Sequence, residues 1–159
     1  MTTVVDTSAL LALLYPDDEH NDRAVSLLSD AAADGKIVVN PVVYSELAGD
    51  DTFDDRDNLD YFLSDTGLVV ESLPRDVAFR AGNAFETHLA RRGETLQCPT
   101  CGSEPEVQCP ECDTRLAPRQ HIAADFLIGA HAEATGRLLT FDGGFYRDYF
   151  DIEVRTVAE

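Results

Sequence analysis

Short apolar runs alternate with amphipathic segments along nearly the whole chain, and this alternation restricts the fold more than any other feature. Apolar runs bounded by turn residues predict buried strands, whereas apolar residues spaced by three or four predict helices that cover a sheet. We expect strands at 3–6, 36–40, 67–73, 137–140 and 151–157. We expect helices at 8–15, 21–35, after Asn40-Pro41, and at 59–63, 76–92 and 120–135. This pattern predicts an α/β fold with a central, mainly parallel sheet.

Size and hydropathy predict one domain over residues 1–159. The chain has 159 residues, of which 44% are hydrophobic, which suffices for a packed core but not for two ordinary domains. No run approaches the roughly 18 apolar residues that a membrane crossing needs. The segment 1–4 also lacks the basic residues that begin a signal peptide. We therefore expect a cytoplasmic protein with no membrane partner.

The charge balance is extreme, with 30 acidic against 12 basic residues and a formal net charge of -18. Such a surface repels nucleic acid at ordinary salt, because binding to nucleic acid depends on contacts from Lys and Arg to phosphate. Lys36 is the only lysine, and acid enrichment with lysine depletion is typical of proteins from salt-loving archaea. In about 1 M salt the Debye length is only ~3 Å, so net charge no longer governs encounters. We favour a halophilic source over a protein that avoids nucleic acid.

Four cysteines lie in a Pro-, Glu- and Thr-rich segment, 94–118, which we interpret as a zinc knuckle inserted in the domain. Cys98 and Cys101 form one Cys-x-x-Cys pair, and Cys109 and Cys112 form another. Two such pairs supply the four thiolates of a closed tetrahedral zinc site, with iron as the competing metal. The alternatives are two disulfides, which cytosolic conditions disfavour, or redox-active thiols.

Four acids stand where carboxylates are unusual. Asp6 follows an apolar strand, although it would also cap the next helix, and Asp142 would also suit an Asp-Gly turn. Glu46 and Asp125 lie near apolar helix faces, where a carboxylate is costly unless it is paired or binds a metal. The alternative partner of Asp125 is Arg119 or a histidine. Together the four acids mark the carboxyl edge of one parallel sheet and offer the hard oxygen ligands that Mg²⁺ or Mn²⁺ requires.

Four segments carry a family resemblance: 4–11 (VVDTSALL), 41–47 (PVVYSEL), 121–130 (HIAADFLIGA) and 139–145 (LTFDGGF). In order and spacing they resemble the four motifs of PIN-domain nucleases, and the nearest resemblance is to VapC-type toxins of toxin–antitoxin pairs. The resemblance covers nearly the whole chain except the cysteine-rich insertion.

The resemblance implies a three-layer α/β/α domain that cuts single-stranded RNA with Mg²⁺ or Mn²⁺. The implied catalytic and metal-binding acids are Asp6, Glu46, Asp125 and Asp142, and the implied hydroxyl positions are Ser8 or Thr140. The implied partners are an antitoxin protein and a second copy of the chain in a homodimer. Because the insertion departs from the toxin pattern, two alternatives stay open: a nuclease of ribosomal-RNA maturation, and a non-catalytic module that binds RNA or protein.

Two further groups of residues carry weaker signals. The four histidines share no spacing, so we expect them at the surface or in caps (His20, His88, His121 and His131). The aromatic residues within 145–150 would stack on bases, but we favour a place in the core or a dimer interface.

Overall fold

The computed structural model describes residues 1–92, 96, 103–116 and 123–156. Its centre is a five-stranded sheet with the order β3-β2-β1-β4-β5, in which every pairing is parallel. The carboxyl ends of all five strands therefore meet at one edge, which confirms the predicted sheet. The strands are β1 (Thr2–Val5), β2 (Lys36–Val39), β3 (Val69–Val70), β4 (Gly136–Leu139) and β5 (Glu153–Arg155).

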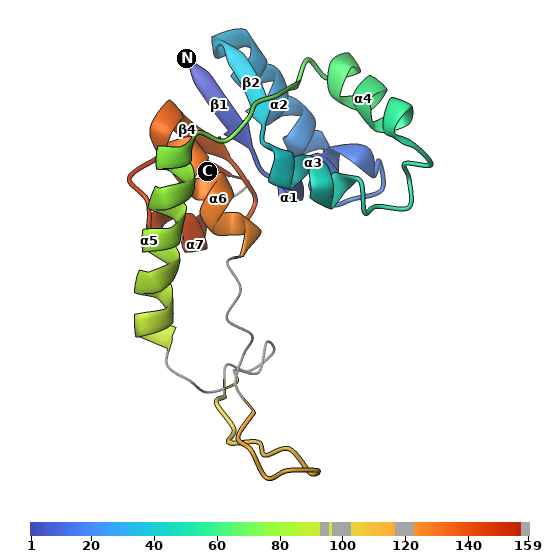
Figure 1. Ribbon diagram of the computed structural model, residues 1–159. Coiled ribbons are helices and arrows are strands. Elements are labelled where there is room, and N and C mark those ends of the chain that lie inside the picture. The colour runs from blue at the N-terminus through green and yellow to red at the C-terminus, as the bar shows by residue number, and fades with distance from the viewer. Residues whose placement is uncertain (93–95, 97–102, 117–122, 157–159) are drawn as a thin grey trace.

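Helices flank the sheet, so the predicted α/β fold class is confirmed. Figure 1 shows α1 to α4 grouped on one side of the molecule and α5 to α7 on the other. The side chains between sheet and helices form one continuous apolar core. The helices are α1 (Thr7–Leu14), α2 (Asn21–Asp34), α3 (Pro41–Leu47), α4 (Arg56–Asp65), α5 (Arg75–Arg92), α6 (Ala124–Thr135) and α7 (Gly143–Arg147).

Local chemistry sets the helix ends that follow β1 and β2. The Asp6 side chain accepts from the backbone N–H of Thr7 and so caps α1. The Asn40 side chain accepts from the N–H groups of Val42 and Val43, directly after β2. Both capping residues follow a buried strand, so α1 and α3 begin at the carboxyl edge of the sheet.

The predicted strand at 67–73 differs clearly from the structure, and one short helix, α7, was not predicted. The strand expected at 67–73 is reduced to Val69–Val70, because Gly67 turns the chain with a φ of 74° and β3 pairs only along one side. The Asp142-Gly143-Gly144 segment, for which a turn was the alternative interpretation, leads into the short helix α7, which has Asp142 at its N-cap.

The expected surface position of His131 is wrong. This residue is 3% exposed in α6, and its Nε2 lies 3.5 Å from Glu71 Oε2. Burial lowers the pKa of His131, although the nearby Glu71 carboxylate opposes that shift. The apolar composition of α6 was the signal for burial.

The insertion is only partly described, because Cys98 and Cys101 lie outside the described residues. Within 103–116 the chain turns back on itself, with an antiparallel bridge between Gln108 and Arg115. Among the helices that the structure describes, none is both long enough and apolar enough to cross a membrane.

Candidate functional site

Asp6 lies at the carboxyl end of β1, the central strand, and is 5% exposed. Three donors hold its carboxylate. Oδ1 accepts from the Thr7 N–H at 2.8 Å, and Oδ2 accepts from the hydroxyls of Thr140 at 2.7 Å and Ser8 at 2.9 Å. Asp6 therefore caps a helix and also presents a fixed carboxylate at the edge of the sheet, so the two interpretations of this residue are compatible.

The two hydroxyl residues join the ends of β1 and β4. The Ser8 and Thr140 hydroxyl oxygens lie 3.3 Å apart. Thr140 Oγ1 also accepts from the N–H of Asp142 at 3.0 Å, and Ser8 Oγ accepts from the N–H of Phe141 at 3.1 Å. These contacts hold the segment that carries Asp142 against the segment that carries Asp6.

Glu46 reaches the same edge from α3. Its Oε2 accepts a hydrogen bond from the Thr7 hydroxyl, across 39 positions of sequence. Thr7 also donates its backbone N–H to Asp6, so this one residue contacts two of the four acids. The sequence interpretation did not single out Thr7. Its position directly after Asp6, at a helix start, was the available signal.

Asp125 lies in the first turn of α6, and its pKa is raised to about 6. Burial is the largest cause, because the charged form of a carboxyl loses hydration there. The negative charges of three other acids add to this shift: Asp6, Glu46 and Asp142. The structure therefore places the four acids close enough for their charges to interact, and Glu46 and Asp142 are the exposed members of this cluster.

Tyr146 is the neutral neighbour of this cluster. The residue is 1% exposed, and its hydroxyl donates to Asp125 Oδ1 over a long 3.5 Å contact. Burial and the negative charges of Asp6 and Asp125 raise the pKa of Tyr146 well above its usual range, so the phenol keeps its proton. The sequence interpretation placed this aromatic in the core and missed its hydroxyl. Arg119, the alternative partner of Asp125, lies outside the described residues.

The carboxylates of the four acids fit a hydrated Mg²⁺ or Mn²⁺ better than an ion enclosed by protein ligands. Among the described residues, no three acidic, histidine or cysteine side chains converge tightly enough to enclose a metal. Mg²⁺ commonly keeps several waters and binds through one or two carboxylates, so an open cluster suits it. Burial is the largest cause of the raised pKa of Asp125, and the repulsion from the other acids that adds to it is what a cation would relieve.

Comparison of the sequence with family models decides the family. The model described as the PIN domain matches residues 3–92, which is more than half of the chain. The chain belongs to the PIN-domain family. The match contains Asp6 and Glu46, while residues 123–156 of this PIN domain contribute Asp125, Asp142 and two further strands of the same sheet. No curated protein gives a significant sequence match.

Solved structures with the same fold include toxin–antitoxin complexes. A chain of VapBC2 from Rickettsia felis, bound to a promoter DNA fragment, has a TM-score of 0.62 and 19% identity, with 98% of each chain covered. A chain of VapBC-1 from nontypeable Haemophilus influenzae has a TM-score of 0.61 and 12% identity over 100% of both chains. VapC20 of Mycobacterium tuberculosis, a toxin that cleaves the sarcin-ricin loop, has a TM-score of 0.51 and 18% identity, with coverage of 94% and 96%.

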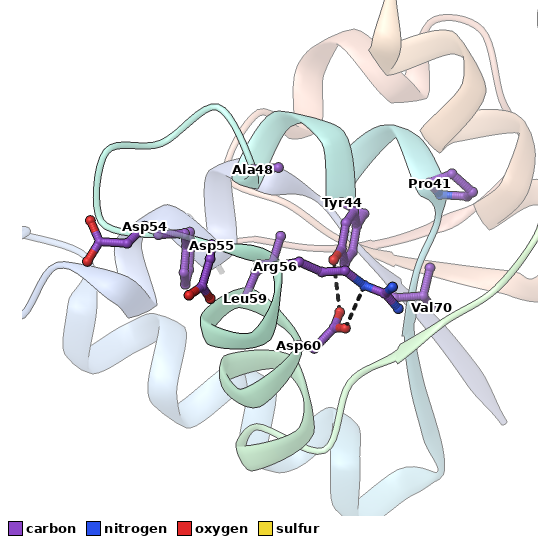
Figure 2. Close-up of a pocket in the computed structure, with 10 residues that line it drawn as sticks. Pro41, Tyr44, Ala48, Asp54, Asp55, Arg56, Leu59, Asp60 and Val70 are labelled. Carbon is purple, nitrogen blue, oxygen red and sulfur yellow. Dashed lines mark hydrogen bonds and ion pairs between the residues drawn. The ribbon is translucent and has the colours of Figure 1, made fainter.

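A groove of about 650 Å³ opens on this PIN domain between α3 and α4, away from the acidic cluster. Figure 2 shows Tyr44 at its centre, where the Tyr44 hydroxyl donates to Asp60 at 2.9 Å and Arg56 donates to the same carboxylate at 3.1 Å. Tyr44 and Ala48 line the groove from α3 and its end, whereas Glu46 contacts Thr7. The two sides of α3 thus belong to different surfaces.

The described half of the insertion holds two cysteines on one tight turn. Asp113 N–H donates to the Cys109 carbonyl at 2.9 Å, and Asp113 adopts a φ of 57°. Hydrogen bonding with Thr114, with a smaller contribution from Cys109, lowers the pKa of the Cys112 thiol. Neither thiol forms a disulfide with a described residue. A thiolate is the form that binds metal.

Proposed function

We propose that this PIN-domain chain is an endoribonuclease, a hydrolase that cuts RNA phosphodiester bonds with Mg²⁺ or Mn²⁺, and the toxin of a toxin–antitoxin pair. The observation that carries the proposal is the cluster of acids at one edge of the sheet. Hydrogen bonds through Thr7 and Thr140 link Asp6 to Glu46 and to the segment of Asp142, and the charges of these three acids act on Asp125. The fold shared with VapBC complexes and with VapC20 supports the toxin role.

The residues that would hold the divalent ion are the four clustered acids: Asp6, Glu46, Asp125 and Asp142. When bound, such an ion supplies a Lewis acid that activates water and stabilises the charge on the leaving oxygen. Without it, the negative cluster repels the phosphodiester, so we expect no productive binding of RNA at the site.

The chain's own residues have separate roles in this proposal. Asp6 keeps one orientation because Thr7, Ser8 and Thr140 all donate to it. Asp125 has a pKa of about 6 and is therefore mainly ionised at neutral pH. In that form it is able to bind a cation or to take a proton from the attacking water.

We further propose that the insertion holds one structural zinc ion through Cys98, Cys101, Cys109 and Cys112. The lowered pKa of Cys112 and the tight turn that joins it to Cys109 support a metal-binding thiolate pair. A small segment without its own core gains folding free energy from such a metal.

The proposed partners are an RNA substrate, an antitoxin protein and a second copy of the chain. With a net charge of -18, we expect RNA binding only where salt screens repulsion, as in a halophilic cytoplasm.

The test is cleavage of labelled single-stranded RNA by the full chain, at molar salt with Mg²⁺ or Mn²⁺ and again with EDTA. Metal-dependent cleavage, together with toxicity relieved by a neighbouring gene product, supports the proposal. Defective ribosomal-RNA ends in a deletion strain would instead indicate the maturation role. Binding of RNA without cleavage under any metal would indicate the non-catalytic module.

A further inference from the structure

The hydroxyl of Tyr146 contacts the acidic cluster, and among the contacts that the structure describes none joins this hydroxyl to a cation. It donates to Asp125 Oδ1 at 3.5 Å, and the negative charge of Asp6 acts on the same hydroxyl. A buried phenol needs an acceptor, and here the acceptor is a carboxylate at the edge of the sheet. One neutral donor thus contacts the acid that α6 contributes to the cluster.

Packing gives this hydroxyl a fixed position. Tyr146 is among the largest fully buried side chains of the molecule, and its ring lies edge-on to Phe145 with centroids 5.4 Å apart. A buried ring in a close-packed core keeps one rotamer. The direction from which the hydroxyl approaches Asp125 is therefore set by α7 and not by the solvent.

We propose that Tyr146 is a positioning residue that orients the carboxylate of Asp125 for a divalent cation, an inference that rests on the proposed function. A neutral donor occupies one lone pair of Asp125 and restricts rotation of the carboxylate. It leaves the negative charge available to the metal, whereas an arginine in its place would compete for that charge. Outer partners of metal ligands act in this way, and their loss typically weakens metal affinity by about 10- to 100-fold.

The chain offers a matched control in Tyr149. Its ring belongs to the same aromatic cluster, with its centroid 5.2 Å from that of Phe145, but its hydroxyl contacts His88 Nδ1 at 2.8 Å. Tyr146→Phe and Tyr149→Phe each remove one oxygen and keep a ring. Only the first removes a donor to the acidic cluster.

The experiment measures Mn²⁺ binding to the full chain by calorimetry and by electron paramagnetic resonance, without RNA. We expect the Kd for Mn²⁺ to rise by about 10-fold or more in Tyr146→Phe and to stay within about 2-fold of the wild type in Tyr149→Phe. In cleavage assays, the Mn²⁺ concentration for half-maximal rate should rise by the same factor, while KM for RNA stays unchanged.

Three results would overturn the inference: an unchanged Mn²⁺ affinity in Tyr146→Phe, an equal loss in both variants, or a Tyr146→Phe chain that circular dichroism shows to be unfolded. The last would make the hydroxyl a requirement of the fold. If the wild type binds Mn²⁺ but never cuts RNA, the proposed function fails, and the comparison of affinities still decides the role of Tyr146. A wild type that binds no Mn²⁺ overturns both.

Discussion

Thr140 donates a hydrogen bond to Asp6 at 2.7 Å, although 134 positions separate the two residues. The register of the sheet explains this contact, because Val5 of β1 is paired with Leu139 of β4 and the backbone N–H of Asp6 donates to the Leu139 carbonyl at 2.9 Å. The residues that follow two paired strand ends are therefore neighbours. Parallel pairing thus turns distant segments into one edge where polar side chains meet.

Replacement of Thr140 by Val should weaken both stability and RNA cleavage. Thr140 is fully buried, and Val keeps its shape but removes the donor to Asp6 and the acceptor for the Asp142 N–H. Buried polar groups left without a partner cost about 1–3 kcal/mol. Denaturant unfolding should show a loss of stability of that size. We also expect the rate of cleavage to fall at least about 10-fold, which is typical when a residue that hydrogen-bonds a metal ligand is lost.

The matched control is Thr87→Val, whose hydroxyl donates only within α5, to the Asn83 carbonyl at 3.0 Å on an exposed face. This variant should change neither the free energy of unfolding nor the rate of RNA cleavage appreciably. Equal behaviour of the two variants would show that the Thr140 hydroxyl does not organise the site.

Replacement by Ala should have opposite effects on stability at two glycines in neighbouring helices. A Cβ at Gly129 of α6 would lie 2.3 Å from the buried ring of Phe150, whereas a Cβ at Gly82 of α5 would meet nothing within 4 Å. We expect Gly129→Ala to destabilise by about 1–3 kcal/mol through overpacking. Gly82→Ala should stabilise by roughly 0.5–1 kcal/mol, because Ala has the higher helix propensity. Thermal unfolding in one buffer compares them, and a neutral Gly129→Ala would mean that Phe150 has room to move.

Much of the fold was predictable because each strand and helix has a local pattern. The apolar run before Asp6 and the Asn40-Pro41 helix start carry their own signals, and the structure has a strand and a helix start there. The length of β3 was not predictable, since a strand extends only as far as its neighbour pairs with it. The sequence pattern at 67–73 contains no information about that pairing.

The candidate site was predictable in its acids but not in the partners of those acids. Asp6 and Asp142 follow strands, and their type and position suggest an oxygen site. Thr7 is marked only by its position directly after Asp6 at a helix start. Tyr146 carries no signal for a polar contact, because it lies in an aromatic segment that indicates a core. Which atoms they meet depends on how α3, α6 and α7 pack at the edge of the sheet.

The insertion should contain one zinc ion per chain, and elemental analysis of purified protein measures this directly. Replacement of one ligand by Cys112→Ser or Cys98→Ser should remove the metal, because a structural zinc site needs all four thiolates. Limited proteolysis should then cut within 94–118 while the sheet resists. Asp125→Asn serves as the control and should retain its zinc. Iron in place of zinc would be visible as a coloured protein, and oxidised thiols with neither metal would refute the knuckle.

The variant Asp125→Asn should abolish metal-dependent cleavage but stabilise the metal-free protein, with a defined pH dependence. The folded pKa of Asp125 is about 6, against an unfolded value of about 3.9. Because the folded value is raised, the wild type keeps its full stability below about pH 4 and loses stability as the pH rises through about 6. Two pKa units correspond to about 3 kcal/mol. In EDTA the variant should therefore exceed the wild type by up to that amount above pH 6, and by little at pH 4.

Thermal unfolding in EDTA across pH 4–8 measures this difference, and Asp148→Asn is the matched control. Asp148 is an exposed acid at the end of α7, outside the acidic cluster, so its variant should follow the wild type at each pH. Added Mn²⁺ should raise the stability of the wild type and remove the advantage of Asp125→Asn, because the cation relieves the repulsion and binds only the intact site.

If Asp125 is instead half of a structural ion pair, Asp125→Asn leaves the charge of its partner unpaired and costs about 3–5 kcal/mol at neutral pH. A large drop in EDTA would thus assign this carboxylate to the fold and not to the chemistry.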